Sequence, residues 1–297
     1  MRDPLIRRIA GGDPLLFDGA LGTRLIARGL SDGTPPEDWV LRHPEQLLDV
    51  HRSYVDAGSE VIAACTFGAN RLRLRKAGLE GRIEAINVEA VRLAREAAGK
   101  SVYVAADIGP TGEFLEPIGA LTEADAETVF EEQAKYLAQT DVDFLFLETF
   151  YELREARIAL KACRKTAPLI PVAASLTFSR KPRGFFTVMG DPAISSLQIL
   201  LEDGAFLVGS NCTLAAEGML ELARVLISGG LQAPLILQPN AGEPLVTKHG
   251  IVYPQDAETF SAAAAEMLAL GVRAVGGCCG TDESHIRAVK KKLEMRF

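Results

Sequence analysis

Three of the five cysteines stand in segments rich in small or polar residues. Cys278 and Cys279 are adjacent within Gly276-Gly277-Cys278-Cys279-Gly280, and Cys212 follows Asn211. Adjacent cysteines rarely bridge each other, because a disulfide needs Cβ atoms about 3.8 Å apart and a relaxed torsion angle. The nearby glycines permit backbone angles that turn both sulfurs to one side. We therefore expect Cys212, Cys278 and Cys279 to bind one metal ion.

Three thiolates with an exchangeable fourth position are typical of a catalytic zinc site. A structural zinc would want a fourth protein ligand, and none of the histidines follows a strand-like run: His43, His51, His249, His285. A thiolate-rich zinc activates water poorly but deprotonates a thiol that binds it. The three cysteines thus favour alkyl transfer to sulfur over hydrolysis. Three unliganded core cysteines are the alternative.

Two carboxylates follow apolar runs and could bind the substrate of such a site. Asp18 and Glu148 can hold a cationic amine through charge-assisted hydrogen bonds, so a thiol with an amino-acid head fits. Its carboxylate would need backbone N–H donors, which we expect from the Gly19-Ala20 and Thr66-Phe67 turns. The competing interpretations are a turn cap for Asp18 and an ion pair with an arginine for Glu148.

Eight short apolar runs are predicted to be strands. Most are apolar almost throughout, as expected of parallel strands buried on both faces. The predicted strands are Leu15–Asp18, Val61–Phe67, Val102–Ile108, Phe144–Thr149, Ile170–Thr177, Phe206–Asn211, Pro234–Gln238 and Ala274–Cys278.

Amphipathic helices are predicted between these strands. They are Pro44–Ala57, Arg82–Ala98, Thr122–Gln139, Glu152–Thr166, Pro192–Glu202, Ala215–Ile227, Gln255–Leu270 and Asp282–Glu294. Eight strand–helix units in 297 residues predict a single-domain (β/α)₈ TIM barrel over residues 1–297. A doubly wound open sheet is the rival, but Asp18–Thr23 lacks the glycine spacing of a dinucleotide site.

The active site of such a barrel lies at the carboxyl ends of its strands. Acids, thiols and amides collect at the predicted strand ends, which include Asp18, Cys65, Asp107, Glu148, Cys212, Asn240 and Cys278. Cys65 is a weaker ligand candidate, and Cys163 is expected to pack within a helix. The longest irregular segments, Gly29–Glu37 and Ser179–Gly190, are expected to be loops at the same rim.

Bulk properties exclude several classes of protein. The net charge of −7, with one short basic run at Lys290–Lys292, argues against nucleic-acid binding. No run approaches 18 apolar residues, so no membrane span is expected. An odd number of cysteines without a secretion signal predicts a reducing, cytoplasmic location.

Taken together, these motifs resemble those of the homocysteine S-methyltransferase family. The resemblance is strongest to the homocysteine-binding module of cobalamin-dependent methionine synthase. It runs in order along almost the whole chain, through Asp18–Thr23, Thr66–Asn70, Asp107–Gly112, Glu148–Phe150, Gly209–Cys212, Pro239–Pro244, Tyr253-Pro254 and Gly276–Thr281.

The resemblance implies a zinc-dependent enzyme that methylates L-homocysteine to methionine by SN2 attack of a zinc-bound thiolate. It implies Cys212, Cys278 and Cys279 as zinc ligands, and Asp18 and Glu148 near the substrate amine. Asn240 matches a family position beside the metal. We expect its amide oxygen to be the exchangeable fourth ligand.

The resemblance also bears on the methyl donor. Betaine-dependent members typically carry tyrosines where this chain has Gly68 and Thr149, so a methyl-corrinoid (methylcobalamin) is the expected donor. It would come from a separate corrinoid protein, or from cobalamin and folate domains missing from this chain. The alternatives are an S-methylmethionine- or betaine-dependent homocysteine or selenol methyltransferase and, more remotely, a non-catalytic zinc- or thiol-binding scaffold.

Overall fold

The fold is a closed parallel barrel. In this computed structural model, which describes residues 4–31, 33–248 and 250–295, the strands pair in the order β1-β12-β9-β8-β5-β4-β3-β2. A parallel bridge between Phe17 and Val61 joins the two ends of that order. The strands are β1 (Leu15–Leu16), β2 (Val61–Ala63), β3 (Tyr103–Ile108), β4 (Phe144–Phe150), β5 (Val172–Leu176), β8 (Leu207–Ala215), β9 (Leu235–Asn240) and β12 (Ala274–Val275). The predicted TIM barrel is confirmed.

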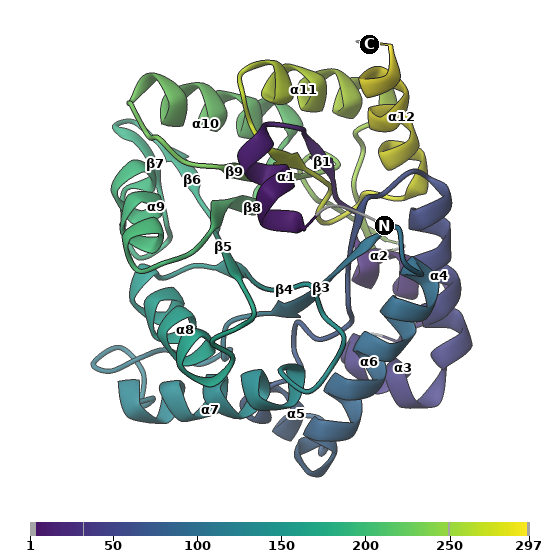
Figure 1. The fold of residues 1–297 in the computed structure, drawn as a ribbon, viewed down its shortest axis with the longest axis vertical. Coiled ribbons are helices and arrows are strands. Elements are labelled where there is room, and N and C mark those ends of the chain that lie inside the picture. The colour runs from purple at the N-terminus through teal and green to yellow at the C-terminus, as the bar shows by residue number, and fades with distance from the viewer. Residues whose placement is uncertain (1–3, 32, 249, 296–297) are drawn as a thin grey trace.

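A helix follows each strand on the outside of the barrel (Figure 1). All eight predicted helices are confirmed, and Thr122 caps one of them by accepting a hydrogen bond from Asp125 N–H. They are α4 (Pro44–Asp56), α6 (Ile83–Ala98), α7 (Glu123–Leu137), α8 (Leu153–Thr166), α9 (Ala193–Glu202), α10 (Ala216–Ser228), α11 (Ala257–Ala269) and α12 (Glu283–Glu294).

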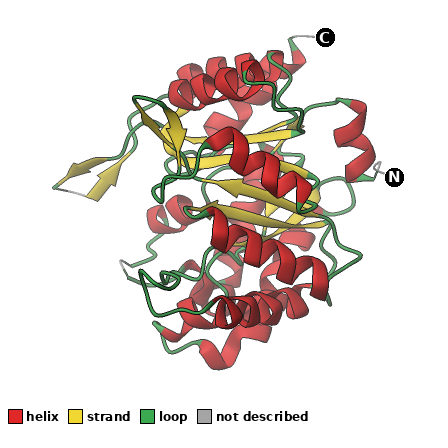
Figure 2. Cartoon of the chain, turned by 90° about the vertical axis from the view of Figure 1, so that its left-hand side faces the viewer, coloured by secondary structure: helices red, strands yellow, loops and turns green. Residues whose placement is uncertain are grey.

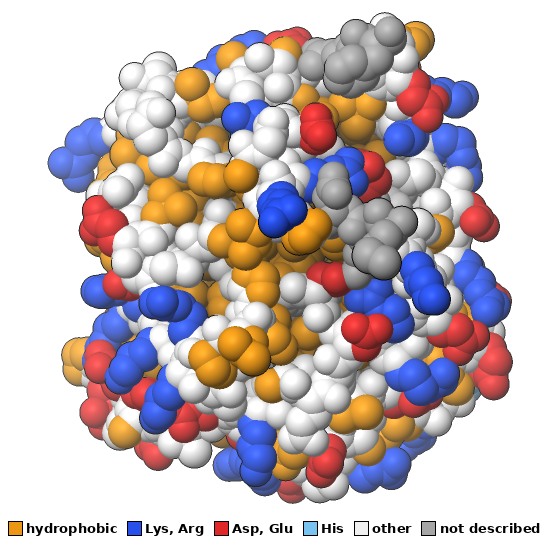
Figure 3. Space-filling view, viewed as in Figure 1, with side chains coloured by type: hydrophobic (Ala, Val, Ile, Leu, Met, Phe, Trp, Pro, Cys, Tyr) orange, Lys and Arg blue, Asp and Glu red, His pale blue; other side chains and the backbone are white. Residues whose placement is uncertain are grey.

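Several short elements are not apparent from the sequence patterns. Helix α1 (Leu5–Gly11) lies across the barrel axis in Figure 1, and its Leu5 and Ile9 pack with Phe17, Phe144 and other side chains of the barrel interior. This amphipathic helix covers one end of the barrel with its apolar side. Figure 3, drawn from the same side, shows hydrophobic side chains gathered around the centre of this face. The other short helices are α2 (Leu21–Ala27), α3 (Pro36–Arg42), α5 (Arg71–Arg75) and the 3₁₀ turn η1 (Glu80–Arg82).

Two β-hairpins extend from the opposite end. Strands β6 (Ser179–Lys181) and β7 (Gly184–Phe186) pair antiparallel, so the prediction of an irregular Ser179–Gly190 segment is wrong over these residues. Strands β10 (Leu245–Thr247) and β11 (Gly250–Val252) form the second hairpin, which projects from the barrel in Figure 2. Gly29–Glu37 is irregular until α3 begins at Pro36.

The core has two layers, one inside the barrel and one between strands and helices. Tight packing of this kind fixes the strand ends, and with them the side chains at the rim. Among the described residues, no helix is long and apolar enough to cross a membrane.

Candidate active site

The structure brings the three predicted thiols together at the carboxyl ends of β8 and β12. The sulfurs of Cys212, Cys278 and Cys279 lie within 4.8 Å of one another, and those of Cys212 and Cys279 are 3.9 Å apart. Sulfurs bound about 2.3 Å from a tetrahedral zinc would be roughly 3.8 Å apart. Hydrogen bonds from the Cys278 and Cys279 thiols lower the pKa of Cys212, so Cys212 ionises first. The cluster could bind a metal.

An irregular backbone directs Cys212 towards the barrel mouth. Cys212 and Thr213 have φ values of 60° and 55°, and the register of β8 against β9 shifts between Asn211 and Ala215. Left-handed backbone costs a non-glycine residue about 1–2 kcal/mol. Thr149 has the same geometry, with φ of 63°, beside Glu148 on β4. Strained bulges therefore aim one thiol and one carboxylate into the site.

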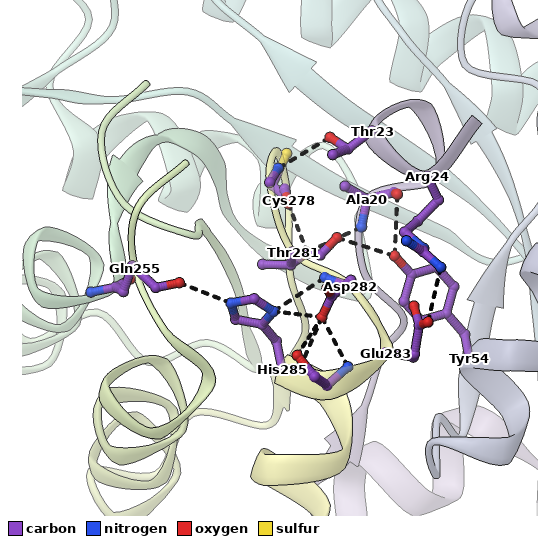
Figure 4. Close-up of polar contacts among 12 residues, drawn as sticks. Ala20, Thr23, Arg24, Tyr54, Gln255, Cys278, Thr281, Asp282, Glu283 and His285 are labelled. Atoms are coloured by element: carbon purple, nitrogen blue, oxygen red, sulfur yellow. Dashed lines mark hydrogen bonds and ion pairs between the residues drawn. The ribbon is translucent and has the colours of Figure 1, made fainter. Parts of the chain in front are cut away.

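The loop that carries Cys278 and Cys279 is fixed by Thr281 (Figure 4). The Thr281 hydroxyl donates to Cys278 O at 2.7 Å and accepts from Ala20 N–H at 3.1 Å. The Thr23 hydroxyl accepts from Gly280 N–H at 3.1 Å. These bonds connect the cysteine loop to the loop after β1, so the thiols and Asp18 keep a fixed relation.

The adjacent glycines are needed for close packing more than for unusual backbone angles. A Cβ on Gly277 would lie 2.3 Å from the Thr281 hydroxyl. Gly280 alone among the three glycines of this motif has a left-handed φ, of 83°. The expectation that the glycines turn the sulfurs through special angles is thus met only at Gly280.

Asn211 is a buried amide that connects three strands to the thiols. Its oxygen accepts hydrogen bonds from Thr149 N–H at 2.8 Å and the Ser175 hydroxyl at 2.7 Å. Its Nδ2 donates to the Thr149 hydroxyl at 2.6 Å and contacts the Cys278 sulfur at 3.8 Å. The sequence motif contains Asn211, but its positioning role depends on contacts between strands far apart in the sequence.

A cavity of about 720 Å³ opens beside the thiols. Asp18, Glu148 and all three cysteines line it, so the predicted metal and substrate residues share one space. The lining also includes Phe67, the only aromatic side chain among the described residues of the wall. Such a cavity can enclose a small amino acid next to the sulfurs.

Burial raises the pKa values of the two predicted carboxyl groups. It raises the pKa of Asp18 to about 8, although a hydrogen bond from Ala63 N–H at 2.8 Å opposes the shift. It also raises the pKa of Glu148, to about 7. The Asp18 carboxyl accepts from Ala63 N–H on β2 and also from its own backbone N–H, and the described ion pairs join Glu148 to no arginine.

The predicted backbone donors differ in what they contact. Ala20 N–H is bonded to Thr281, and Thr66 N–H is bonded to Ala64 O at 2.8 Å. The N–H groups of Gly19 and Phe67 have no acceptor among the described contacts, and both residues line the cavity. Of the four predicted residues, Gly19 and Phe67 therefore have backbone N–H groups available to a substrate carboxylate.

Asn240 lies at the end of β9 beside the thiols. Its side chain hydrogen-bonds to Cys212, and its Oδ1 is buried without a partner in the described structure. An unpartnered buried oxygen normally needs a ligand, an ion or water. The spacing of the three sulfurs suits a zinc ion, and the Asn240 amide lies beside them.

Tyr253 extends the thiol cluster on the side of β11. Its hydroxyl hydrogen-bonds to Cys279, and its ring packs on Gly280. The other cysteines take no part in the cluster: Cys65 is buried in the cavity wall, and Cys163 packs inside α8.

Glu37 is a buried cavity residue that the sequence patterns did not indicate. Its carboxylate accepts a 2.6 Å hydrogen bond from Gly68 N–H, and a Cβ on Gly68 would lie 2.9 Å from it. Arg73 stacks over the Phe67 ring at 5.0 Å and also lines the cavity. Glu37 thus fills the space that a larger residue at position 68 would use.

Comparison with solved structures identifies the fold class. The metallated form of the homocysteine methyltransferase MmuM from Escherichia coli superposes with a TM-score of 0.80 at 22% identity, covering 98% of this chain and 100% of that one. At this identity the similarity establishes the shared barrel.

Sequence comparison then identifies the family. The model of the homocysteine S-methyltransferase family matches residues 15–293, so the chain belongs to that family of methyltransferases. It is 30% identical to the S-methylmethionine–homocysteine S-methyltransferase BHMT2 of Pongo abelii, covering 97% of this chain and 81% of the relative. Betaine–homocysteine S-methyltransferase 1 of Bos taurus is also 30% identical, with 97% and 74% covered. Methionine synthase of Mycobacterium tuberculosis is 29% identical, but the match covers only 25% of that longer protein.

Proposed function

We propose that this protein transfers a methyl group to the thiol of L-homocysteine in a zinc-dependent reaction that yields methionine. The observation that carries this proposal is the convergence of three thiols and two carboxyls on one cavity. Family membership supports homocysteine as the acceptor. The proposed domain is the whole barrel, residues 1–297, and the proposed location is a reducing compartment such as the cytoplasm, in keeping with five free cysteines.

Cys212, Cys278 and Cys279 would hold the zinc, with the Asn240 oxygen as the exchangeable fourth donor. A zinc ion in this site would supply a Lewis acid that favours the thiolate form of a bound thiol. Asp18 and Glu148 would bind the substrate ammonium, and Gly19 N–H and Phe67 N–H its carboxylate. These contacts would hold the substrate sulfur beside the three cysteines, where orientation favours in-line attack on a methyl group.

A methyl-corrinoid on a separate protein or on missing domains is our proposed donor. Gly68 and Thr149 leave the wall without aromatic side chains at those positions, and Phe67 alone makes a poor cage for a quaternary ammonium. The resemblance of the sequence motifs to the homocysteine-binding module of cobalamin-dependent methionine synthase supports the same donor.

A small cationic donor is the second candidate. The cavity wall carries four carboxyl groups and two cations, Arg73 and Lys76, and this acidic excess favours a positively charged donor such as S-methylmethionine or betaine. Relatives named for these two donors match along most of their length, which supports this candidate equally.

A donor panel distinguishes the candidates. Zinc-loaded protein is incubated with L-homocysteine and, separately, methylcobalamin, S-methylmethionine, betaine or methyltetrahydrofolate, and methionine is measured. Methylcobalamin turnover supports the corrinoid proposal, and turnover with a cationic donor alone supports the second candidate. Replacing homocysteine by other thiols or a selenol tests the acceptor. A protein that binds zinc and thiol but transfers no methyl group from any donor would match the scaffold alternative.

A further inference from the structure

A third carboxyl group, Asp107, belongs to the cavity wall. It stands on β3 next to β4, with its backbone in register with Phe146, two residues before Glu148. The residue is 6% exposed and lines the cavity. Its Oδ1 is buried and has no hydrogen-bond partner in the described structure. Oδ1 therefore receives no hydrogen bond from the described protein, and the residue borders the substrate space.

Asp107 is in hydrogen-bond contact with Glu148. Two carboxyl groups can make such a contact only when one of them carries a proton. Burial, followed by the charge of Glu148, raises the pKa of Asp107 well above its usual value. Asp18 adds to this shift, so the three carboxyls act on one another across the cavity.

The three carboxyls lack a protein cation. The described ion pairs join none of Asp18, Asp107 and Glu148 to a lysine or an arginine. Buried carboxylates are stable only when they are paired or protonated. A ligand that brings positive charge and several N–H donors would satisfy them, and a primary ammonium group has both properties.

We propose that Asp107 is a specificity-determining residue that completes, with Asp18 and Glu148, a three-carboxyl site for the α-ammonium group of the acceptor. This inference rests on the proposed function and adds a residue and a selection rule to it. The ammonium donates one N–H to the Asp107 carboxyl group, and Asp18 and Glu148 accept the others. Thiols that lack a protonated amine leave these acceptors unpaired and are rejected.

The test measures binding, which needs no methyl donor. Zinc-loaded protein is titrated calorimetrically with L-homocysteine and with 4-sulfanylbutanoate, which has the same carbon chain, thiol and carboxylate but no amine. The wild type should bind homocysteine at least 100-fold more tightly. Asp107→Asn should weaken homocysteine binding at least 10-fold and leave 4-sulfanylbutanoate within threefold, so the ratio falls.

Glu155→Gln is the matched control. Glu155 is a buried carboxyl with an unpartnered oxygen, but it lies outside the cavity and bonds to Thr111. This variant should keep the wild-type ratio. Asp107→Ser repeats the test with a smaller side chain if Asp107→Asn fails to fold, as judged by circular dichroism and zinc content.

The outcomes separate the inference from the proposed function. A folded, zinc-loaded Asp107 variant with the wild-type ratio overturns the inference alone. A wild type that binds both thiols equally also overturns it and leaves homocysteine as an acceptor. A wild type that binds neither thiol overturns the proposed function together with the inference.

Discussion

Each cysteine of the cluster contributes one sulfur, so single substitutions test the metal site directly. Changing Cys278 or Cys279 to alanine should remove stoichiometric zinc and methyl transfer while the barrel remains folded, because these residues stand after the last strand. Zinc content by mass spectrometry and far-UV circular dichroism measure the two effects. Cys163→Ala, buried inside α8, should keep full zinc content. Full turnover by a zinc-free Cys278 variant would contradict the proposed role of the metal.

Asn211 should affect both stability and metal affinity. Asn211→Ala leaves the Thr149 N–H and the Ser175 hydroxyl without their acceptor, which costs about 1–3 kcal/mol for each buried group left unpaired. It also removes the contact to the Cys278 sulfur, and loss of such support weakens metal binding roughly 10–100-fold. Urea unfolding and zinc competition with a chelator measure the two losses.

A matched control for Asn211 is Asn87→Ala. Asn87 is a buried amide of α6 whose Nδ2 donates to Ala69 O and Ile83 O. This variant should lose stability but keep its zinc affinity. Equal zinc affinity in both variants would show that Asn211 does not position the thiols.

At the scale of elements, the loop after β12 depends on the absence of a side chain at Gly277. Gly277→Ala places a Cβ against the Thr281 hydroxyl, which already bonds to Cys278 O and Ala20 N–H. We expect a lower melting temperature and at least tenfold weaker zinc binding. Gly81→Ala should change neither, because no atom lies within 4 Å of its added Cβ. Normal zinc affinity in Gly277→Ala would mean that the loop can relax.

The elements differ in how far their sequence predicts them. Continuous apolar runs such as Phe144–Thr149 predicted every barrel strand, because strands buried on both faces need apolar residues throughout. Short elements such as α2 and β6 have too few residues to show a period. The bulges at Thr149 and Cys212 depend on register against neighbouring strands, so local sequence does not reveal them.

Local sequence also reveals only part of the site, because some of its features depend on contacts between distant segments. Strand-end chemistry led to Asp18, Glu148 and the three cysteines, and the structure places all five on one cavity. The sequence indicated Asp107 at a strand end, but the inference about its role depends on the unpartnered oxygen and the contact to Glu148. Glu37 reaches the cavity from α3, outside the strands altogether.

For the whole molecule, the buried carboxyls predict a pH-dependent stability of the ligand-free protein. The folded-state pKa values of Asp18 and Glu148, about 8 and about 7, exceed those of an unfolded chain. The folded state therefore binds more protons between about pH 4 and 8, and stability falls as pH rises through this window. The melting temperature of Asp18→Asn should fall less steeply over the same range. An identical slope in both proteins would contradict the raised pKa of Asp18.

We propose that the three cysteines hold a zinc ion to which homocysteine adds its sulfur. X-ray absorption at the zinc edge counts the sulfur ligands directly, with and without L-homocysteine. We expect three sulfurs and one lighter ligand in the free protein, and four sulfurs after homocysteine is added. An unchanged coordination shell in the presence of saturating homocysteine would contradict this proposal.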